Sequence, residues 1–117
     1  MTDFLSKLRY ANFKRDMLYN PEKNISISYR GNELAGEVGE LCNKIKKLEA
    51  QRLGLPNAPK YKLNEGIKEE IADVLICLDL LCMDLEEVLK EQVILEVITT
   101  DKFNSTSIKL QLPTKIK

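Results

Sequence analysis

One run of sequence decides the fold: Glu69-Glu70-Ile71-Ala72-Asp73-Val74-Leu75-Ile76-Cys77-Leu78-Asp79-Leu80-Leu81. If this run is helical, apolar side chains occupy nearly every face of the helix, which predicts that it is buried on most sides. Carboxylates are costly in such a helix unless they are paired or bound to a metal. Glu70 and Asp73 are three residues apart, so both can point at one ion. An ion pair between Asp73 and a basic residue of a neighbouring helix is the alternative.

The rest of the chain is also predicted to be mainly helical. Glycine and proline stop signals predict a first helix over residues 3–19, an extended connector over 22–28, a second helix over 29–52, a third over 64–83 and a fourth over 85–103. Asp84 is a candidate N-cap for the fourth helix. The alternative is one continuous helix through Asp84, because no Gly or Pro marks a break. The tail, 104–117, is expected to be irregular. We therefore expect a single all-α domain over residues 1–117, a helical bundle of about four helices.

Composition excludes several classes of function. Hydrophobic residues make up 44% and charged residues 31%, which is an ordinary globular balance. Lys plus Arg equals Asp plus Glu at 18 each, so no overall field favours a nucleic-acid partner. The longest apolar run, 71–83, contains Asp73 and Asp79, and the start of the chain lacks the pattern of a signal peptide. We expect a cytoplasmic protein without a membrane partner.

The chain has three cysteines and no histidine. Cys42, Cys77 and Cys82 lie in apolar helical patterns without CxxC spacing, so we expect buried free thiols. Without histidine, a Ser-His or Cys-His catalytic pair is excluded, and so is a His-based zinc site. A bound metal would need oxygen ligands, which points to Mg²⁺, with Mn²⁺ as the alternative.

The second helix carries an acidic stripe. At roughly 100° per residue, Glu33, Glu37 and Glu40 fall on one face, together with Lys44 and Lys47. Like charges at this spacing repel one another, and a divalent cation would turn the repulsion into binding. The alternative is a solvated acidic face that the two lysines partly neutralise.

Taken together, the two helices carry a recognisable pair of motifs. Glu37-x-x-Glu40 followed by Glu70-x-x-Asp73 resembles the ExxE and ExxD motifs of the MazG-like nucleoside triphosphate pyrophosphohydrolases, of the small stand-alone kind found in bacteria and phages. The sequence around the motifs also resembles these proteins, at residues 30–40 and at the segment Lys102-Phe103-Asn104. The resemblance extends over about residues 8–113. A single ExxE carries almost no information, whereas two motifs in order on suitable helices are fairly specific.

The resemblance implies a function and a site. It implies hydrolysis of a nucleoside triphosphate between the α and β phosphates, in an all-α bundle that pairs into dimers or tetramers. Glu37, Glu40, Glu70 and Asp73 would be the Mg²⁺ ligands and catalytic residues, one glutamate also orienting or deprotonating the attacking water. Lys102 and Asn104 would contact the phosphates or the sugar.

The first motif departs from the family pattern at one position. Many members have two adjacent glutamates there, and the first of that pair is Gly36 in this chain. We hypothesise that Glu33 supplies the missing carboxylate. The alternative is a site with one ion fewer, which would leave a slow enzyme or an inactive nucleotide-binding or interaction module.

Five further residues have two interpretations each. Asp79 either holds a ligand or the sugar, or pairs with a structural partner. Asn32 either begins the helix or contacts the base. Lys44 and Lys47 either reach the triphosphate or are solvated. Tyr19 either stacks on a base, with Asn12 and Arg15 of a family-like segment, or packs in the fold.

Overall fold

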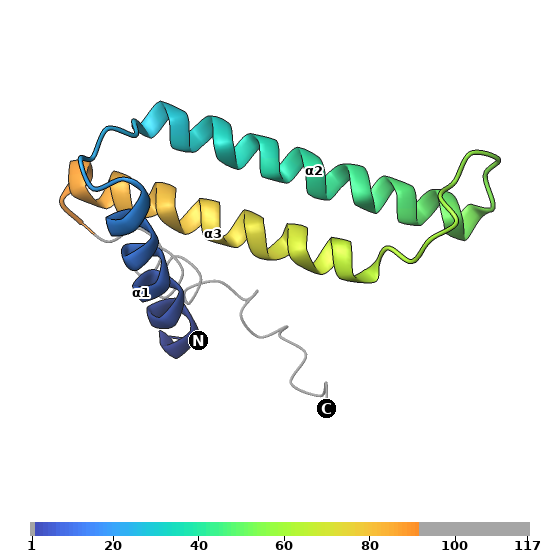
Figure 1. Ribbon diagram of the computed structural model, residues 1–117, viewed down its shortest axis with the longest axis horizontal. Coiled ribbons are helices and arrows are strands. Elements are labelled where there is room, and N and C mark those ends of the chain that lie inside the picture. Colours follow the sequence, from blue (N-terminus) through green and yellow to red (C-terminus); the bar gives the residue numbers. More distant parts are fainter. Residues whose placement is uncertain (1, 92–117) are drawn as a thin grey trace, which may run out of the picture.

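The computed structural model describes residues 2–91, and these form three helices. α1 (Thr2–Tyr19), α2 (Ile27–Leu53) and α3 (Asn64–Leu89) follow one another without a strand in this part of the chain. α2 and α3 run antiparallel as a long hairpin, and α1 crosses the end of the hairpin where α2 begins and α3 ends (Figure 1). The predicted all-α class is confirmed.

The ends of α2 follow from capping residues. The Ser26 side chain accepts a hydrogen bond from the Tyr29 backbone N–H at 3.0 Å, which makes Ser26 the N-cap. The helix therefore begins two residues before the predicted start, and the extended connector is correspondingly shorter. At the other end Gly54 has a φ of 68°, a left-handed conformation that costs glycine little, and its N–H bonds to the last turn. The predicted stop at Gly54 is confirmed.

α3 does not break at Asp84. The helix continues to Leu89, so the predicted start of a fourth helix there is wrong and the competing continuous helix is right. The physical reason is that the Asp84 carboxylate accepts a hydrogen bond from Arg30 Nε at 2.9 Å instead of capping a new helix. Residues 92–103 of the predicted fourth helix, and the tail, lie outside the described residues.

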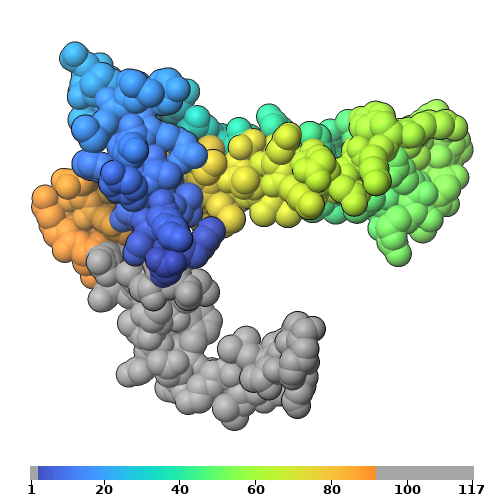
Figure 2. All heavy atoms as spheres, turned by 60° about the horizontal axis from the view of Figure 1, so that its bottom comes forward, coloured from blue at the N-terminus to red at the C-terminus, as the bar shows by residue number. Residues whose placement is uncertain are grey.

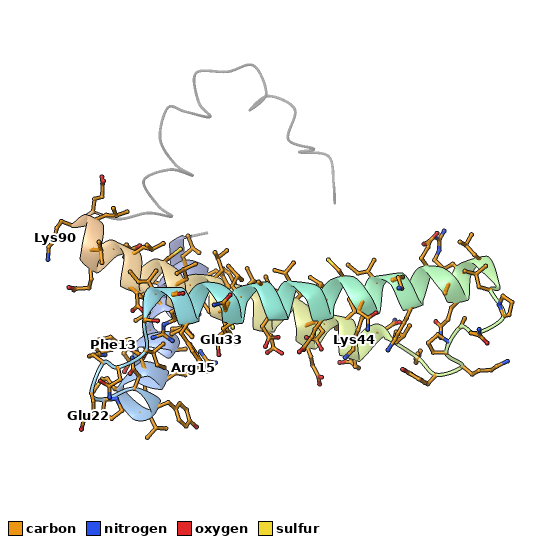
Figure 3. The ribbon with its side chains drawn as sticks, turned by 90° about the horizontal axis from the view of Figure 1, so that it is seen from above. Phe13, Arg15, Glu22, Glu33, Lys44 and Lys90 are labelled. Carbon is orange, nitrogen blue, oxygen red and sulfur yellow. The ribbon has the colours of Figure 1, made fainter. Side chains whose placement is uncertain are left out.

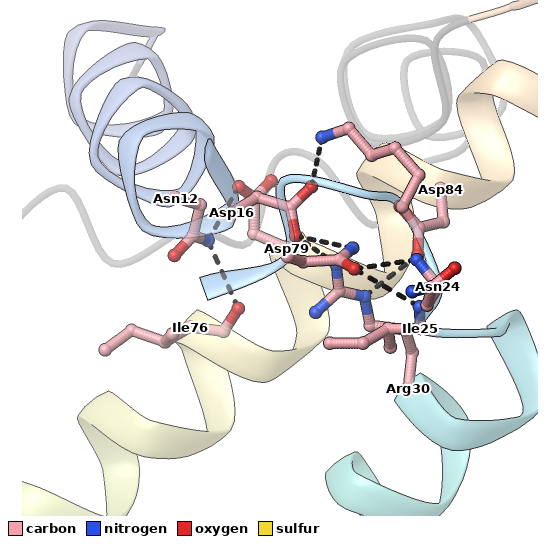
Figure 4. Close-up of polar contacts among 10 residues, drawn as sticks. Asn12, Asp16, Asn24, Ile25, Arg30, Ile76, Asp79 and Asp84 are labelled. Atoms are coloured by element: carbon pink, nitrogen blue, oxygen red, sulfur yellow. Dashed lines mark hydrogen bonds and ion pairs between the residues drawn. The ribbon is translucent and has the colours of Figure 1, made fainter. Parts of the chain in front are cut away.

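Polar contacts connect α1 to α3. Asn12 is fully buried and donates hydrogen bonds to the Asp79 carboxylate and to the Ile76 carbonyl. Arg9 donates to Asp79 and to Glu86, with 2.8 Å as the shortest distance to each (Figure 4 shows the Asn12 and Asp79 side). Burying these charges requires such pairing, and it fixes how α1 lies on α3.

A second buried ion pair ties α1 and α3 to α2. Arg30 is 4% exposed and donates to Asp16 at 2.6 Å and to Asp84 at 2.9 Å. Lys23, from the loop between α1 and α2, completes the set with a 2.8 Å bond to Asp16. All three helices therefore meet at this set of charged side chains.

The apolar core of the described chain is small. Among residues 2–91 the buried hydrophobic side chains are Leu63, Cys77 and Cys82. The expectation that the third helix is buried on most sides is therefore wrong for the single chain, because much of its apolar surface remains open. The expectation of buried thiols holds for Cys77 and Cys82 but not for Cys42, which is exposed.

Figure 2 shows the consequence of this arrangement for the shape. α1 covers one end of the hairpin, and the rest of α2 and α3 projects as an arm. The arm leaves apolar side chains exposed on both of its helices: Val38, Ile45, Ile71, Leu75 and Leu78. None of the described helices is long and apolar enough to cross a membrane.

Candidate metal centre

Three of the predicted carboxylates come together between α2 and α3. Glu37, Glu70 and Asp73 each offer an oxygen atom, and these oxygens lie within 4.8 Å of one another. Glu37 comes from α2, while Glu70 and Asp73 lie one turn apart on the facing side of α3. The antiparallel hairpin thus brings the two motifs to the same level, as the spacing on each helix predicts. We call these three residues the cage.

Two oxygens of the cage are buried without a partner. Within residues 2–91, Glu37 Oε1 and Glu70 Oε1 are inaccessible to solvent and have no hydrogen-bond partner. Glu70 as a whole is 8% exposed. A buried carboxylate oxygen without a partner is costly, and a bound cation is one of the few ligands that would remove the cost.

The electrostatics of Glu37 show the same crowding. Burial raises the pKa of the Glu37 carboxyl, and the negative charges of Glu40, Asp73, Glu70 and Glu33 raise it further. Like charges at a shared site disfavour ionisation of each carboxyl, and a divalent cation would reverse that effect.

Glu40 and Glu33 lie beside the cage rather than in it. Glu40 is exposed, and its oxygens are not among those within 4.8 Å of one another. Glu33 is half-buried one turn before Glu37, on the same side of α2 as Lys44 (Figure 3). Both charges act on Glu37, so they contribute to the field of the cage without being shown as ligands.

Lys44 reaches across the hairpin to the cage. Its Nζ lies 3.0 Å from Glu70 Oε2, and its side chain is 31% exposed. The hydrogen bond to Glu70 raises the pKa of Lys44, and the charges of Glu70, Glu69 and Glu40 add to the effect against a smaller opposing contribution from burial. The prediction of a solvated lysine is therefore wrong for Lys44.

Asp73 has no such partner. In the described part of the chain no lysine or arginine lies within ion-pair distance of its carboxylate, so the alternative of an ion-paired Asp73 is wrong. Asp79 shows the opposite result, since its partners are Arg9 and Asn12, and of its two interpretations the structural pairing is the right one.

Other predicted site residues lie away from the cage or outside the described chain. Asn32 is exposed and does not begin α2, which Ser26 caps. Tyr19 is 77% exposed, so it does not pack within the fold. Lys47 lines a hollow beside the loop that joins α2 to α3. Lys102 and Asn104 lie outside the described residues.

Sequence reasoning missed two neighbours of the cage. A Cβ added at Gly66 would lie 3.2 Å from Lys44 Nζ, so the missing side chain leaves room for the lysine. The signal was available, because Gly66 stands one turn before Glu70 on a helix. Cys77, one turn after Asp73, is buried, and burial together with the charges of Glu33, Glu37 and Asp73 raises the pKa of its thiol to about 11.

Comparison with known proteins adds no relative: no family model, no curated protein and no solved structure matches this chain.

Proposed function

We propose that this protein is a Mg²⁺-dependent nucleoside triphosphate pyrophosphohydrolase of the MazG-like kind. The observation that carries the proposal is the pair of buried, unpartnered oxygens, Glu37 Oε1 and Glu70 Oε1, in a cage that Asp73 completes. The reaction would release a nucleoside monophosphate and pyrophosphate.

The residues present fit a hard divalent cation. Mg²⁺ prefers carboxylate oxygens and keeps several of its waters, so three carboxylates with one open side are a suitable set. Glu37, Glu70 and Asp73 would hold the ion, and Glu40 would approach it from its exposed position one turn along α2. The buried oxygens support this fit, because neither accepts a hydrogen bond from a donor among the described residues.

Each residue has a role that follows from its place. A bound Mg²⁺ would polarise the phosphoryl group and lower the pKa of a coordinated water. One glutamate of the cage would also orient the attacking water and accept its proton. Lys44, which is bonded to Glu70 of the cage, would supply a positive charge to the phosphates of the nucleotide.

A second copy of the chain is part of the proposal. The arm exposes Val38 and Ile45 on α2, and Ile71, Leu75 and Leu78 on α3. An apolar surface of this kind on a helix pair is typical of a subunit interface, and pairing two hairpins would build a bundle around it. A homodimer or homotetramer is therefore the expected form of the enzyme.

The test is product analysis on a panel of the eight common NTPs and dNTPs, with and without Mg²⁺. Nucleotide products are separated by ion exchange, so that a monophosphate with pyrophosphate is distinguished from a diphosphate with phosphate. We expect the first pair, only with Mg²⁺. Glu70→Gln, which keeps the shape of the side chain and removes its charge, is expected to reduce kcat about 100-fold or more.

Two further variants serve as a control for Glu70→Gln and as a test of the role of Glu33. Glu65→Gln changes an exposed carboxylate on the same helix and should keep native activity. Glu33→Gln tests the hypothesis that Glu33 replaces the carboxylate missing at Gly36, and full activity in this variant would end that hypothesis. If the folded native protein releases no pyrophosphate from any nucleotide, the alternative gains: a MazG-like module that binds a nucleotide or a partner without turnover.

A further inference from the structure

The Glu70 carboxylate is divided between two environments. Oε1 is buried, has no partner and belongs to the cage, whereas Oε2 accepts a hydrogen bond from Lys44 Nζ at 3.0 Å. The lysine comes from α2 and the glutamate from α3, so this bond crosses the hairpin at the level of the cage. The cage thus carries a positive charge of its own.

The backbone of α3 makes room for this bond. A Cβ built at Gly66 would lie 3.2 Å from Lys44 Nζ and 3.4 Å from its Cδ, closer than such contacts normally come. Because Gly66 has no side chain, the lysine can cross the first turn of α3 and reach Glu70 one turn later. The position of the ammonium group therefore depends on both helices.

The charges of the cage and of Lys44 indicate what the lysine would do. Three carboxylates crowd together in the cage, and a single ammonium group offsets part of their charge. A divalent cation that enters must share Glu70 with Lys44 and is repelled by it, and at this degree of burial the repulsion is only partly screened. A triphosphate that arrives with its metal brings negative charge to which a flexible lysine can turn.

We propose that Lys44 is the resident counter-ion of the cage: it weakens the binding of a free divalent cation, and it turns to the triphosphate when the metal and the nucleotide enter together. This proposal rests on the proposed function for its second half, while the first half concerns the metal alone. Lys44 is a positioning residue in the empty cage and contacts substrate only in the loaded one.

The experiment measures Mn²⁺ binding to the full chain without nucleotide, from the electron paramagnetic resonance signal of free Mn²⁺. Lys44→Met keeps most of the side-chain length and removes the charge. We expect its dissociation constant for Mn²⁺ to be about tenfold lower than that of the native protein, since a partly screened neighbouring charge has an effect of this order. Lys47→Met, one turn further along α2, removes a lysine without a bond to Glu70 and should bind Mn²⁺ as the native protein does.

A second readout is the KM for the best nucleotide of the panel. Lys44→Met should raise KM, and Lys44→Arg, which keeps the charge, should restore both KM and the weaker Mn²⁺ binding. Equal or weaker Mn²⁺ binding by Lys44→Met would overturn the counter-ion role, and an unchanged KM would overturn the contact with the triphosphate. Far-ultraviolet circular dichroism checks that every variant is folded.

The outcomes separate this proposal from the previous one. If the native protein binds Mn²⁺ in a Glu70-dependent way but the variant binds no tighter, only the role of Lys44 fails. If neither the native protein nor Lys44→Met binds Mn²⁺, the metal centre itself fails, and this proposal fails with it. If Mn²⁺ binding tightens as expected but no nucleotide is cleaved, the counter-ion role stands and the enzymatic function does not.

Discussion

At the scale of single residues, the buried acidic side chains of the described chain are of two kinds: those whose carboxylate oxygens are paired, and those that keep an oxygen without a partner. Asp16 is 5% exposed and is bonded to Arg30, Lys23 and Asn20. In the cage, Glu37 and Glu70 each keep an oxygen without a partner. A paired buried carboxylate serves the fold, whereas an unpaired one is a cost that binding can remove.

The pairing of Asp16 predicts a pH dependence of stability. Burial alone would raise the pKa of Asp16, but the hydrogen bonds from Lys23, Arg30 and Asn20 outweigh it, so the pKa lies below the ordinary value of 3.8. The folded state therefore holds the proton less well than the unfolded chain, and stability falls as the pH drops through the lowered pKa. Above about pH 4 the full contribution is present.

Asp16→Asn should remove this dependence and leave Arg30 with Asp84 as its remaining acidic partner. We expect the free energy of unfolding at pH 7 to fall by about 3 kcal/mol or more, because one partner of a buried ion pair is lost. Asp3→Asn, at an exposed pair with Lys7, is the control and should change stability by less than about 0.5 kcal/mol. Urea denaturation between pH 2.5 and 7 measures both, and an equal loss in the two variants would show that the pairing is unimportant.

At the scale of helices, α3 contributes residues both to the cage and to the contact with α1. Its first turns hold Gly66, Glu70 and Asp73 beside α2, and its later turns hold Asp79 and Glu86 beside α1. The continuity of α3 through Asp84 connects the two regions, so the cage and the crossing of α1 share one helix.

Gly66 gives a prediction for this element. Alanine is the better helix former, which favours Gly66→Ala by up to about 1 kcal/mol, but its Cβ would press on Lys44 Nζ. The lysine end is flexible and can yield, so we expect a net gain in the free energy of unfolding of only about 0.5 kcal/mol. Gly31→Ala in α2, where nothing lies within 4 Å of the added Cβ, is the matched control and should gain more. Urea denaturation of the two variants measures these gains in stability. Equal gains would mean that a Cβ at position 66 does not press on Lys44.

At the scale of the whole molecule, the described chain leaves many large apolar side chains exposed. Leu75 and Leu78 on α3, and Ile45 on α2, are each more than a third exposed. Three buried hydrophobic side chains are a small core for residues 2–91, so we expect folding to be coupled to association.

Light scattering coupled to size exclusion should accordingly find a dimer or tetramer, with a melting temperature that rises with protein concentration. Leu75→Glu places a charge on the proposed interface and should shift the protein to monomers of lower stability. Leu55→Glu, at an equally apolar but loop-borne exposed site, should leave the assembly intact. A native protein that stays monomeric, with a melting temperature independent of concentration, would contradict the proposed interface.

The sequence by itself determined the helical class, the end of α2 and three members of the cage, although it also counted Glu40 among the ligands and the structure places that residue outside the cage. Helical periodicity and the cap at Gly54 are local, and so is the three-residue spacing of Glu70 and Asp73, which is why the helical class and the meeting of these two with Glu37 could be predicted. Only the tertiary structure decided the rest: whether Asp84 breaks the helix, which acids are paired, and how much of α3 is covered. Those outcomes depend on partners distant along the chain, Arg30 for Asp84 and Arg9 for Asp79, and a periodic pattern does not name its partner.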